Sequence, residues 1–414
     1  MSNATIAPLD LARTTFLLGS GISIPSGYPS TGDLTKELLS KNWSHDRDQA
    51  KSTIPVESPL YCELYSLRIE AIKGLIRLLK SHIEQHLALL GKGEPTYEDI
   101  YYLARQLLDS LMGEYDNPGL LPLMSDLRDK VVTMTANLNA AYGHDNILNP
   151  EQNHGLQDLL NGCLEFIEES VAAQLSLRTP IKGLQLLDEC RSKSEGTTLH
   201  IATLNHDTML EAHFSSTSFS DGFVLMGEGT SMFSPESFST TNATVQLLKL
   251  HGSVNWYQYK SRGGPTLSVK VTTADKNHIK DPANEDLLLP ESRLLLAGTN
   301  NKELAYGAGI FLELMFQFQR RLKETRYLIV SGYGFGDKGI NNRIWAWIDS
   351  HRDNRLILLH ADVSHLSANA KPSLRLNSNR LKAEGRLVFV DKWLCDCSIE
   401  DIKRELRFSA RDSG

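Results

Sequence analysis

Hydrophobic residues follow two patterns along the chain, and each pattern predicts a different kind of element. Short apolar runs that stop at glycine or at a polar residue are typical of buried strands. Such runs occupy residues 16–18, 199–204, 245–250, 294–296, 327–330, 356–359 and 387–390. Because helical stretches separate many of these runs, we predict an α/β fold built on a Rossmann-like, doubly wound parallel sheet.

The second pattern consists of apolar residues spaced three and four apart, which place one hydrophobic stripe on a helix. The clearest examples are Ile69, Ile72, Ile76, Leu79, Ile83 and Leu87, followed by Leu156, Leu160, Leu164, Ile167 and Val171. We therefore predict a large, mainly helical insertion at residues 35–195. Residues 10–34 and 196–395 then form the sheet domain, and residues 396–414 form a C-terminal helix or tail.

Two polar segments fit neither pattern. Residues 214–244 are rich in Ser, Thr and Gly, and residues 258–291 carry Gly, Pro, Lys and Asp. Both segments flank His251. We predict irregular loops here, which are either lids over a site or ordinary surface excursions.

Composition narrows the classes of function. A formal net charge of −7 argues against a broad surface for binding nucleic acid or anionic membrane directly. No apolar stretch approaches the roughly 20 residues of a membrane span, and no signal-peptide pattern opens the chain. The five cysteines are too scattered for a disulfide framework. We expect a soluble, cytoplasmic protein.

The first candidate site follows the first apolar run, where a strand leads into a Gly-x-Gly turn. Glycine lets backbone amides approach a pyrophosphate closely, and a following helix start adds its dipole. A Gly-x-Gly sequence alone also occurs in ordinary tight turns. The candidate cofactor-binding residues at this turn are Gly19, Ser20, Gly21, Ile22 and Ser23.

Polar residues follow two later strands, at 199–204 and 245–250, and form the second candidate site. His251 suits proton transfer, because the ordinary pKa of histidine lies near neutrality. Asn205 can hold an amide, a hydroxyl or a water molecule, and Asp207 can orient that group or support developing positive charge. The alternative is structural: Asn205 and Asp207 are also good helix caps, and His251 can be a buried structural histidine.

The motifs at these positions resemble those of the sirtuins. Gly21–Pro29 resembles their opening NAD-binding motif, and residues 203–207 resemble their Thr-x-Asn-x-Asp motif. Residues 249–256 resemble the segment with the catalytic histidine, and residues 331–341 resemble the bacterial form of the late adenosine-binding turn. The resemblance implies that NAD⁺ is bound and cleaved, with Asn205, His251 and Asp207 as catalytic residues. It also implies cofactor contacts from Thr203, Ser331, Gly332 and Tyr333, whereas Asp337 is an N-cap.

Two departures from the sirtuin pattern refine this resemblance. Deacylating sirtuins hold zinc with two Cys-x-x-Cys pairs, but the only close pair here is Cys395-x-Cys397, so we expect no metal. Residues 30–33 replace the usual Asp-Phe-Arg of the cofactor loop.

A zinc-free core with a helical insertion resembles the NADases of bacterial antiphage defence. That resemblance implies NAD⁺ depletion in abortive infection, a homo-oligomer and a HerA-type ATPase partner.

Two other functions remain open from the sequence. An NAD-dependent protein deacylase or ADP-ribosyltransferase would use the same NAD⁺ site, although the zinc module and an acceptor-groove signature are missing. A non-catalytic module that senses NAD⁺ or ADP-ribose would need neither Asn205 nor His251.

Overall fold

The chain forms two compact units in the computed structural model. The first unit, called the sheet body, comprises Met1–Ser30 and Leu175–Gly414, and the second, called the helical body, comprises Thr31–Gln174. The structure describes residues 9–40, 59–90, 93–114, 117–142, 154–176, 178–194, 196–240, 242–262, 264–282 and 285–412. This division differs from the predicted insertion at both ends, because residues 31–34 join the helical body and residues 175–195 join the sheet body.

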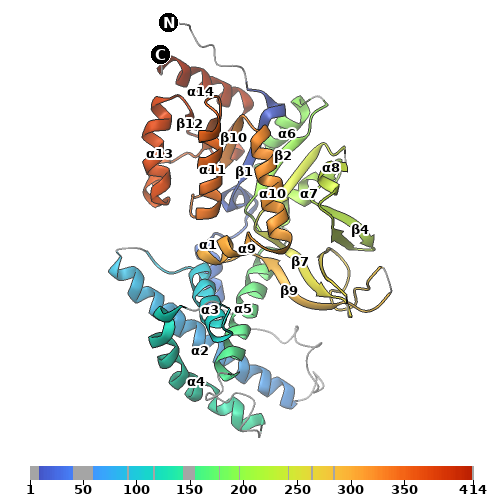
Figure 1. Ribbon diagram of the computed structural model, residues 1–414, viewed down its shortest axis with the longest axis vertical. Coiled ribbons are helices and arrows are strands. Elements are labelled where there is room, and N and C mark those ends of the chain that lie inside the picture. Colours follow the sequence, from blue (N-terminus) through green and yellow to red (C-terminus); the bar gives the residue numbers. More distant parts are fainter. Residues whose placement is uncertain are drawn as a thin grey trace. The chain divides into compact units, whose positions relative to one another are not determined.

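A seven-stranded sheet in the order β12-β11-β10-β1-β2-β6-β3 forms the centre of the sheet body (Figure 1). Its strands are β1 (Thr14–Leu18), β2 (Leu199–Thr203), β3 (Phe219–Ser220), β6 (Val245–Lys249), β10 (Tyr327–Ser331), β11 (Arg355–Leu359) and β12 (Leu387–Val390). Every neighbouring pair is parallel. The predicted α/β fold with a Rossmann-like parallel sheet and a helical insertion is confirmed.

Burial on both faces explains why these strands are continuous apolar runs in the sequence. Every residue of β1 and of β10 is buried. Helix α10 contacts β6, and helices α13 and α14 contact β12. The helices of the sheet body are α6 (Gln185–Lys193), α7 (Met209–Phe214), α8 (Ser237–Thr240), α9 (Thr299–Ala305), α10 (Gly309–Glu324), α11 (Lys338–Ser350), α12 (Val363–Asn369), α13 (Pro372–Ala383) and α14 (Ile399–Asp412).

The strand order places a topological switch point beside β1. From β1 the chain continues into β2 on one side, while β10, which comes much later in the chain, lies on the other side. Leu18, the last residue of β1, pairs with Thr203 of β2 and with Ser331 of β10, so the three strands end at one level. Ligands of doubly wound sheets bind outside the carboxyl ends of the strands at such a point.

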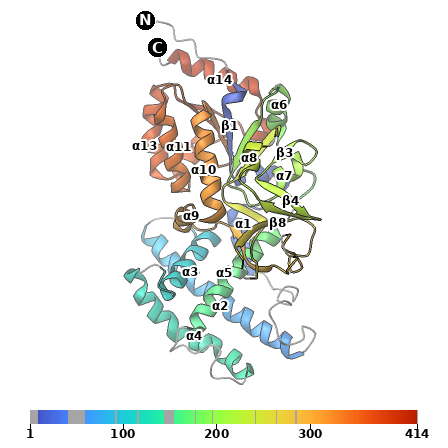
Figure 2. The same ribbon diagram turned by 45° about the vertical axis from the view of Figure 1, so that its right-hand side comes forward.

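The two polar segments around His251 contain strands, so the prediction of irregular loops was wrong for those residues, whereas residues 272–279 do lie outside helices and strands. The two segments contribute to a five-stranded antiparallel sheet in the order β4-β5-β8-β7-β9 (Figure 2). Its strands are β4 (Phe223–Gly227), β5 (Thr230–Phe233), β7 (Gly252–Lys260), β8 (Thr266–Val271) and β9 (Leu289–Leu295). The apolar run at 294–296, which we assigned to the parallel sheet, instead forms the end of β9 and the residue just beyond it.

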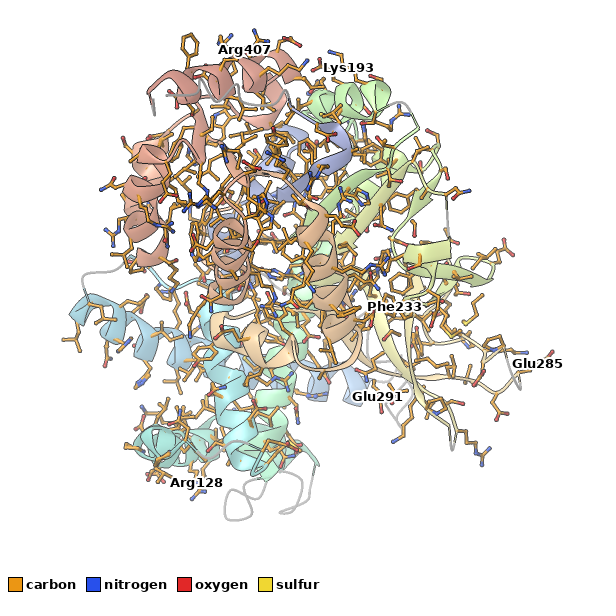
Figure 3. All side chains as sticks on the ribbon, turned by 45° about the horizontal axis from the view of Figure 1, so that its top comes forward. Arg128, Lys193, Phe233, Glu285, Glu291 and Arg407 are labelled. Carbon is orange, nitrogen blue, oxygen red and sulfur yellow. The ribbon has the colours of Figure 1, made fainter. Side chains whose placement is uncertain are left out.

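The composition of this second sheet explains the error. Antiparallel strands with one solvated face carry polar residues at intervals, so they lack the continuous apolar signal of a buried strand. Their apolar side chains still pack together on one side: Phe233, labelled in Figure 3, lies 5.4 Å from Phe223 between ring centroids, and Phe223 lies 4.6 Å from Trp256. The two residues Glu228 and Gly229 join β4 to β5, and Gly229 has φ +68°. A two-residue turn with glycine is the sequence signal by which this hairpin could have been predicted.

The helical body contains the predicted amphipathic helices. Its described elements are α1 (Thr31–Ser40), α2 (Pro59–Leu89), α3 (Tyr97–Leu111), a short 3-10 helix (Pro118–Leu120), α4 (Leu121–Tyr142) and α5 (His154–Gln174). Helix α2 packs against α3, α4 and α5. Ile72, Ile76 and Leu79 of the first predicted stripe and all five residues of the second are buried, as the periodicity requires.

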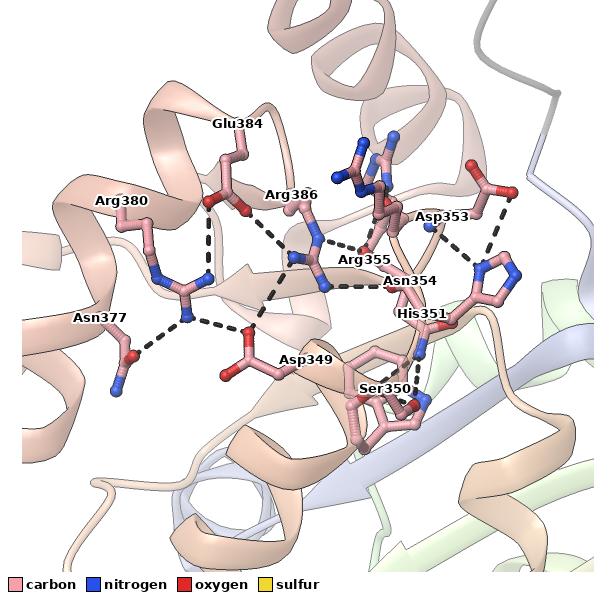
Figure 4. Close-up of polar contacts among 12 residues, drawn as sticks. Asp349, Ser350, His351, Asp353, Asn354, Arg355, Asn377, Arg380, Glu384 and Arg386 are labelled. Carbon is pink, nitrogen blue, oxygen red and sulfur yellow. Dashed lines mark hydrogen bonds and ion pairs between the residues drawn. The ribbon is translucent and has the colours of Figure 1, made fainter.

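The amino ends of β11 and β12 are joined by a set of paired charges (Figure 4). Arg380 donates to Asp349 at 2.9 Å, and Arg386 donates to Glu384 at 3.0 Å. Arg386 also donates to the carbonyl oxygen of His351 at 3.1 Å. These bonds join α13 to α11, and they join Arg386, just before β12, to the residues that follow both helices.

Candidate functional site

The Gly-x-Gly turn after β1 packs directly against the turn after β10. The backbone N–H of Gly19 donates to the carbonyl oxygen of Ser331 at 2.9 Å, and that of Gly21 donates to Gly332 at 3.1 Å. A Cβ on Gly19 would lie 2.7 Å from the Cα of Tyr333, and one on Gly21 would lie 2.8 Å from the Cα of Gly332. The approach of the two turns therefore accounts for both glycines, and their phosphate role stays a prediction.

The helix that follows this turn is short. Ser20–Ser26 forms a 3-10 helix that contains Pro25 and ends at Gly27, whose φ is +81°. A macrodipole depends on peptide units aligned along the helix axis, so this element contributes less to an anion site than the expected α-helix. Ser20 is exposed, whereas Ile22 and Ser23 are buried.

A chain of hydrogen bonds joins this helix to the loop after β2. The side-chain amide of Asn205 donates to the hydroxyl of Ser23 at 3.1 Å, and that hydroxyl donates to Oδ2 of Asp207 at 2.9 Å. Oδ1 of Asp207 accepts from the backbone N–H of Met209 at 3.0 Å. The structure thus brings three predicted site residues together, and Asp207 also satisfies a backbone amide at the start of α7.

Thr203 supports the same loop from the end of β2. Its hydroxyl donates to the carbonyl oxygen of Leu18 at 3.1 Å and accepts from the backbone N–H of Asn205 at 3.1 Å. Thr203 is buried, so it fixes the backbone on which Asn205 is carried. A cofactor contact from this residue stays a prediction.

Lys249 reinforces the loop from the neighbouring strand β6. Its side chain is 1% exposed, lies 2.7 Å from a carboxylate oxygen of Glu211 and donates to the carbonyl oxygen of Asp207. Burial raises the pKa of Glu211, and the charge of Lys249 opposes that rise. Lys249 had no predicted role, because a lysine at the end of an apolar run has no partner that spacing alone identifies.

His251 follows β6 and is held by two residues that come much later in the chain. Its Nε2 lies 2.7 Å from the hydroxyl of Tyr306 and 3.2 Å from Oδ2 of Asp337. The Tyr306 hydroxyl donates to the same Asp337 oxygen at 2.7 Å. Since the tyrosine proton is directed at Asp337, Nε2 of His251 is the donor in its bond to Tyr306. The imidazole is thus fixed in tautomer and in orientation.

Asp337 carries its negative charge in a buried position. Burial raises the pKa of its carboxyl group, but hydrogen bonds from His251, from the backbone of Ile340 and from Tyr306 outweigh burial, so the pKa lies well below its usual range. Oδ1 of Asp337 accepts from the Ile340 N–H at 2.9 Å, which caps α11. The expected N-cap is therefore present, and the same carboxylate also orients the histidine.

Tyr333 secures Asp337 from the turn after β10. Its hydroxyl accepts from the backbone N–H of Asp337 at 3.1 Å and donates to Oδ1 of Asn341 at 2.8 Å. Gly332 has φ +67°, and a Cβ there would lie 2.6 Å from the backbone nitrogen of Ile22. Cofactor contacts from Ser331, Gly332 and Tyr333 stay predictions, while their structural role is visible.

The antiparallel sheet fixes the backbone of His251. The N–H of Leu296, just beyond β9, donates to the His251 carbonyl oxygen at 2.8 Å. Gly252, the first residue of β7, has φ +77°, and a Cβ there would overlap the carbonyl oxygen of Leu294. Strand β7 therefore begins directly after the candidate catalytic residue, and the second sheet is part of its support.

Strand register brings these parts to one place. Thr203 pairs with Lys249, and Asn205 and His251 each lie two residues beyond this pair. The ring of His206, between Asn205 and Asp207, lies 6.2 Å from the ring of His251. The predicted residues from the ends of β1, β2, β6 and β10 thus gather at the carboxyl edge, beside the switch point.

Tyr306 and Asp337 are the partners of His251 that sequence reasoning did not assign. No family model matches the chain, and no curated protein is detectably similar to it. Within the described residues, no group of three or more His, Cys, Asp or Glu side chains is placed to hold a metal ion. In the same part of the chain, no helix has the length and apolar character to cross a membrane.

Proposed function

We propose that this protein is a sirtuin-like NAD⁺ glycohydrolase that cleaves NAD⁺ into nicotinamide and ADP-ribose. The observation that carries the proposal is the buried His251–Tyr306–Asp337 group at the switch point of a parallel sheet. Asn205 lies at the same edge, and its Oδ1 is buried with no hydrogen-bond partner. A histidine oriented by a carboxylate, beside a buried amide acceptor, supports proton transfer and ligand orientation rather than packing alone.

The reaction assigns a task to each residue. Breaking the bond between nicotinamide and ribose develops oxocarbenium character on the ribose, and water then adds to its anomeric carbon. Because Nε2 of His251 carries the proton that it donates to Tyr306, Nδ1 is the position that would take a proton from a ribose hydroxyl or from water. The ionised Asp337 would stabilise the imidazolium that results, and Asn205 would accept a hydrogen bond from a bound hydroxyl, amide or water.

A single assay separates this function from its alternatives. The purified chain is incubated with NAD⁺, with and without an acetylated peptide, and nicotinamide, ADP-ribose and peptide products are measured. Nicotinamide and ADP-ribose in equal amounts without peptide support the glycohydrolase. Release that requires the peptide would replace it with a deacylase or an ADP-ribosyltransferase. NAD⁺ binding without any release would indicate a sensing module.

The proposed activity also implies control, because an unrestrained NADase would deplete the NAD⁺ of its own cell. We place the protein in the cytoplasm as an antiphage effector that acts as a homo-oligomer with a HerA-type ATPase. A partner can shift activity only by its differential affinity for active and inactive states. Nicotinamide release measured across size-exclusion fractions tests this: full activity in a monomeric fraction without partner would contradict it.

A further inference from the structure

His206 carries a buried ring nitrogen for which the protein supplies no donor. The residue is 7% exposed, and its Nδ1 has no hydrogen-bond partner. The neighbouring Asn205 is 4% exposed, and its Oδ1 is also without a partner. Two unpartnered polar atoms on consecutive residues at the carboxyl edge are unusual, because buried polar atoms are nearly always satisfied.

The surroundings of His206 decide whether Nδ1 donates or accepts. The ring hydrogen-bonds to the backbone of Gly252, and this bond favours the protonated ring, as a bond to a carbonyl oxygen does. Because Nδ1 has no partner, the nitrogen that donates to Gly252 is Nε2. A neutral ring protonated at Nε2 presents a lone pair at Nδ1.

The ring stays neutral for two reasons. Burial lowers the pKa of His206 well below its ordinary value, and the nearby side chains of His251, Lys302 and Lys249 lower it further. Nδ1 is therefore an acceptor, as is the carbonyl oxygen of Asn205. Leaving two acceptors unpaired destabilises the ligand-free fold, and a ligand that brings N–H or O–H groups relieves that cost.

We propose that His206 is a specificity-determining residue whose Nδ1 accepts a hydrogen bond from an uncharged donor of the bound dinucleotide. Two groups of NAD⁺ supply such a donor next to the reacting bond: the N–H₂ of the carboxamide and a hydroxyl of the nicotinamide ribose. This inference rests on the proposed function, and it identifies which ligands the site prefers. An oxygen anion at this position would face a lone pair and be rejected.

Two substitutions of His206 separate the acceptor from the structural bond. Glutamine places an amide near the position of Nε2, so His206→Gln keeps a donor to Gly252 and removes the acceptor at Nδ1. Asparagine places its amide near the position of Nδ1, so His206→Asn keeps an acceptor and removes the bond to Gly252. Both are made in the full chain on a His251→Ala background, so that NAD⁺ survives a calorimetric titration.

We expect His206→Gln to weaken NAD⁺ binding by about 5- to 30-fold, the loss typical of one buried hydrogen bond. His206→Asn should stay within about threefold of its background. Equal affinity for the Gln variant and its background would overturn the proposal. Equal weakening by Gln and Asn, in chains that unfold at the background temperature, would also overturn it, because the ring would then act structurally.

Two analogues identify the donor. Nicotinic acid adenine dinucleotide replaces the amide with a carboxylate, and 2′-deoxy-NAD⁺ lacks a hydroxyl on the nicotinamide ribose. The background should bind one of them more weakly than NAD⁺, and His206→Gln should lose that discrimination. If the Gln variant keeps full discrimination against both analogues, the proposal fails. If the His251→Ala background does not bind NAD⁺ at all, the proposed function fails as well as this inference. If the background binds NAD⁺ and the Gln variant behaves like it, only this inference fails.

Discussion

The two edges of the parallel sheet satisfy their polar groups in different ways. At the amino edge, Arg380 and Asp349 are 43% and 50% exposed in their side chains and pair with each other in solvent. At the carboxyl edge, His251 and Asp337 are each 4% exposed and pair out of solvent. Polar atoms with no partner occur there on Asn205 and His206. The exposed charges of the amino edge are therefore satisfied by each other and by water, whereas Asn205 and His206 at the carboxyl edge keep buried polar atoms that a ligand could satisfy.

This difference follows from what the fold requires of each edge. The exposed charges at the amino edge, Arg380 and Asp349, can leave each other for water at little cost, so their exact geometry matters little. Charges at the carboxyl edge are removed from water, and each needs its partner, because an unpaired buried charge is strongly destabilising. Substitutions of the buried polar residues at the carboxyl edge should therefore change activity, whereas substitutions of the exposed charges at the amino edge should change stability slightly and leave activity unchanged.

The largest expected difference is between two histidines. His251→Ala should lower nicotinamide release at saturating NAD⁺ by about 10²- to 10⁴-fold, the usual contribution of a general acid or base. His351→Ala, at the amino edge, removes a side chain that is 65% exposed and should leave turnover unchanged. Near-parental turnover in His251→Ala, with the fold verified by circular dichroism, would remove this residue from the mechanism.

A pair of glycines compares backbone strain at the two edges. Gly332→Ala should lower the free energy of unfolding by about 3 kcal/mol or more, because it adds a Cβ 2.6 Å from the Ile22 nitrogen to a positive φ. Gly196→Ala, just before β2, has φ +71° with nothing within 4 Å of the new Cβ. It should cost about 1–2 kcal/mol from φ strain alone. Equal losses in urea unfolding would show that the packed turns tolerate a side chain.

The same comparison shows how far sequence alone can predict such a site. Asn205 and His251 each follow an apolar strand, and parallel strands bring their carboxyl ends to one edge, so their grouping could be predicted. The Tyr306–His251 contact joins residues 55 apart, and Tyr306 meets Asp337 across another 31. No local pattern encodes such contacts, because they depend on how α9 and α11 pack. The antiparallel sheet was missed for a related reason: its half-solvated strands lack a strong period.

The buried carboxylate provides the next test. Asp337→Asn keeps a side-chain oxygen that can cap α11 but removes the charge beside His251. Losing a charged hydrogen bond should lower turnover by about 10- to 100-fold, with a smaller change in NAD⁺ affinity. Asp349→Asn is the matched change at the amino edge and should leave both values unchanged. If Asp337→Asn kept parental turnover, the negative charge would have no part in the reaction.

Stability should depend on pH through His206. Its pKa is lowered in the folded protein, first by burial and then by nearby positive charges, whereas the unfolded chain has the ordinary value near 6.5. The unfolded state therefore binds more protons below about pH 6.5, and stability falls as pH falls, by up to about 1.4 kcal/mol per unit. His206→Asn should flatten the urea-unfolding profile between pH 7 and 5, whereas the exposed His351→Asn should not. Parallel profiles for His206→Asn and parent would contradict this assignment.

The smallest effect is expected at the amino edge itself. Arg380→Ala removes the ion pairs that Arg380 makes with the exposed carboxylates of Asp349 and Glu384. Exposed ion pairs contribute about 0–1 kcal/mol to stability, and less at high salt. Arg386, 8% exposed and bonded to the His351 carbonyl oxygen, stays in place and keeps the strands joined. We therefore expect less than about 1 kcal/mol in urea unfolding at low salt, no measurable change in 1 M NaCl, and unchanged NAD⁺ turnover. A loss of activity without a loss of stability would mean that the two edges are coupled through the sheet, and the division of roles between them would have to be abandoned.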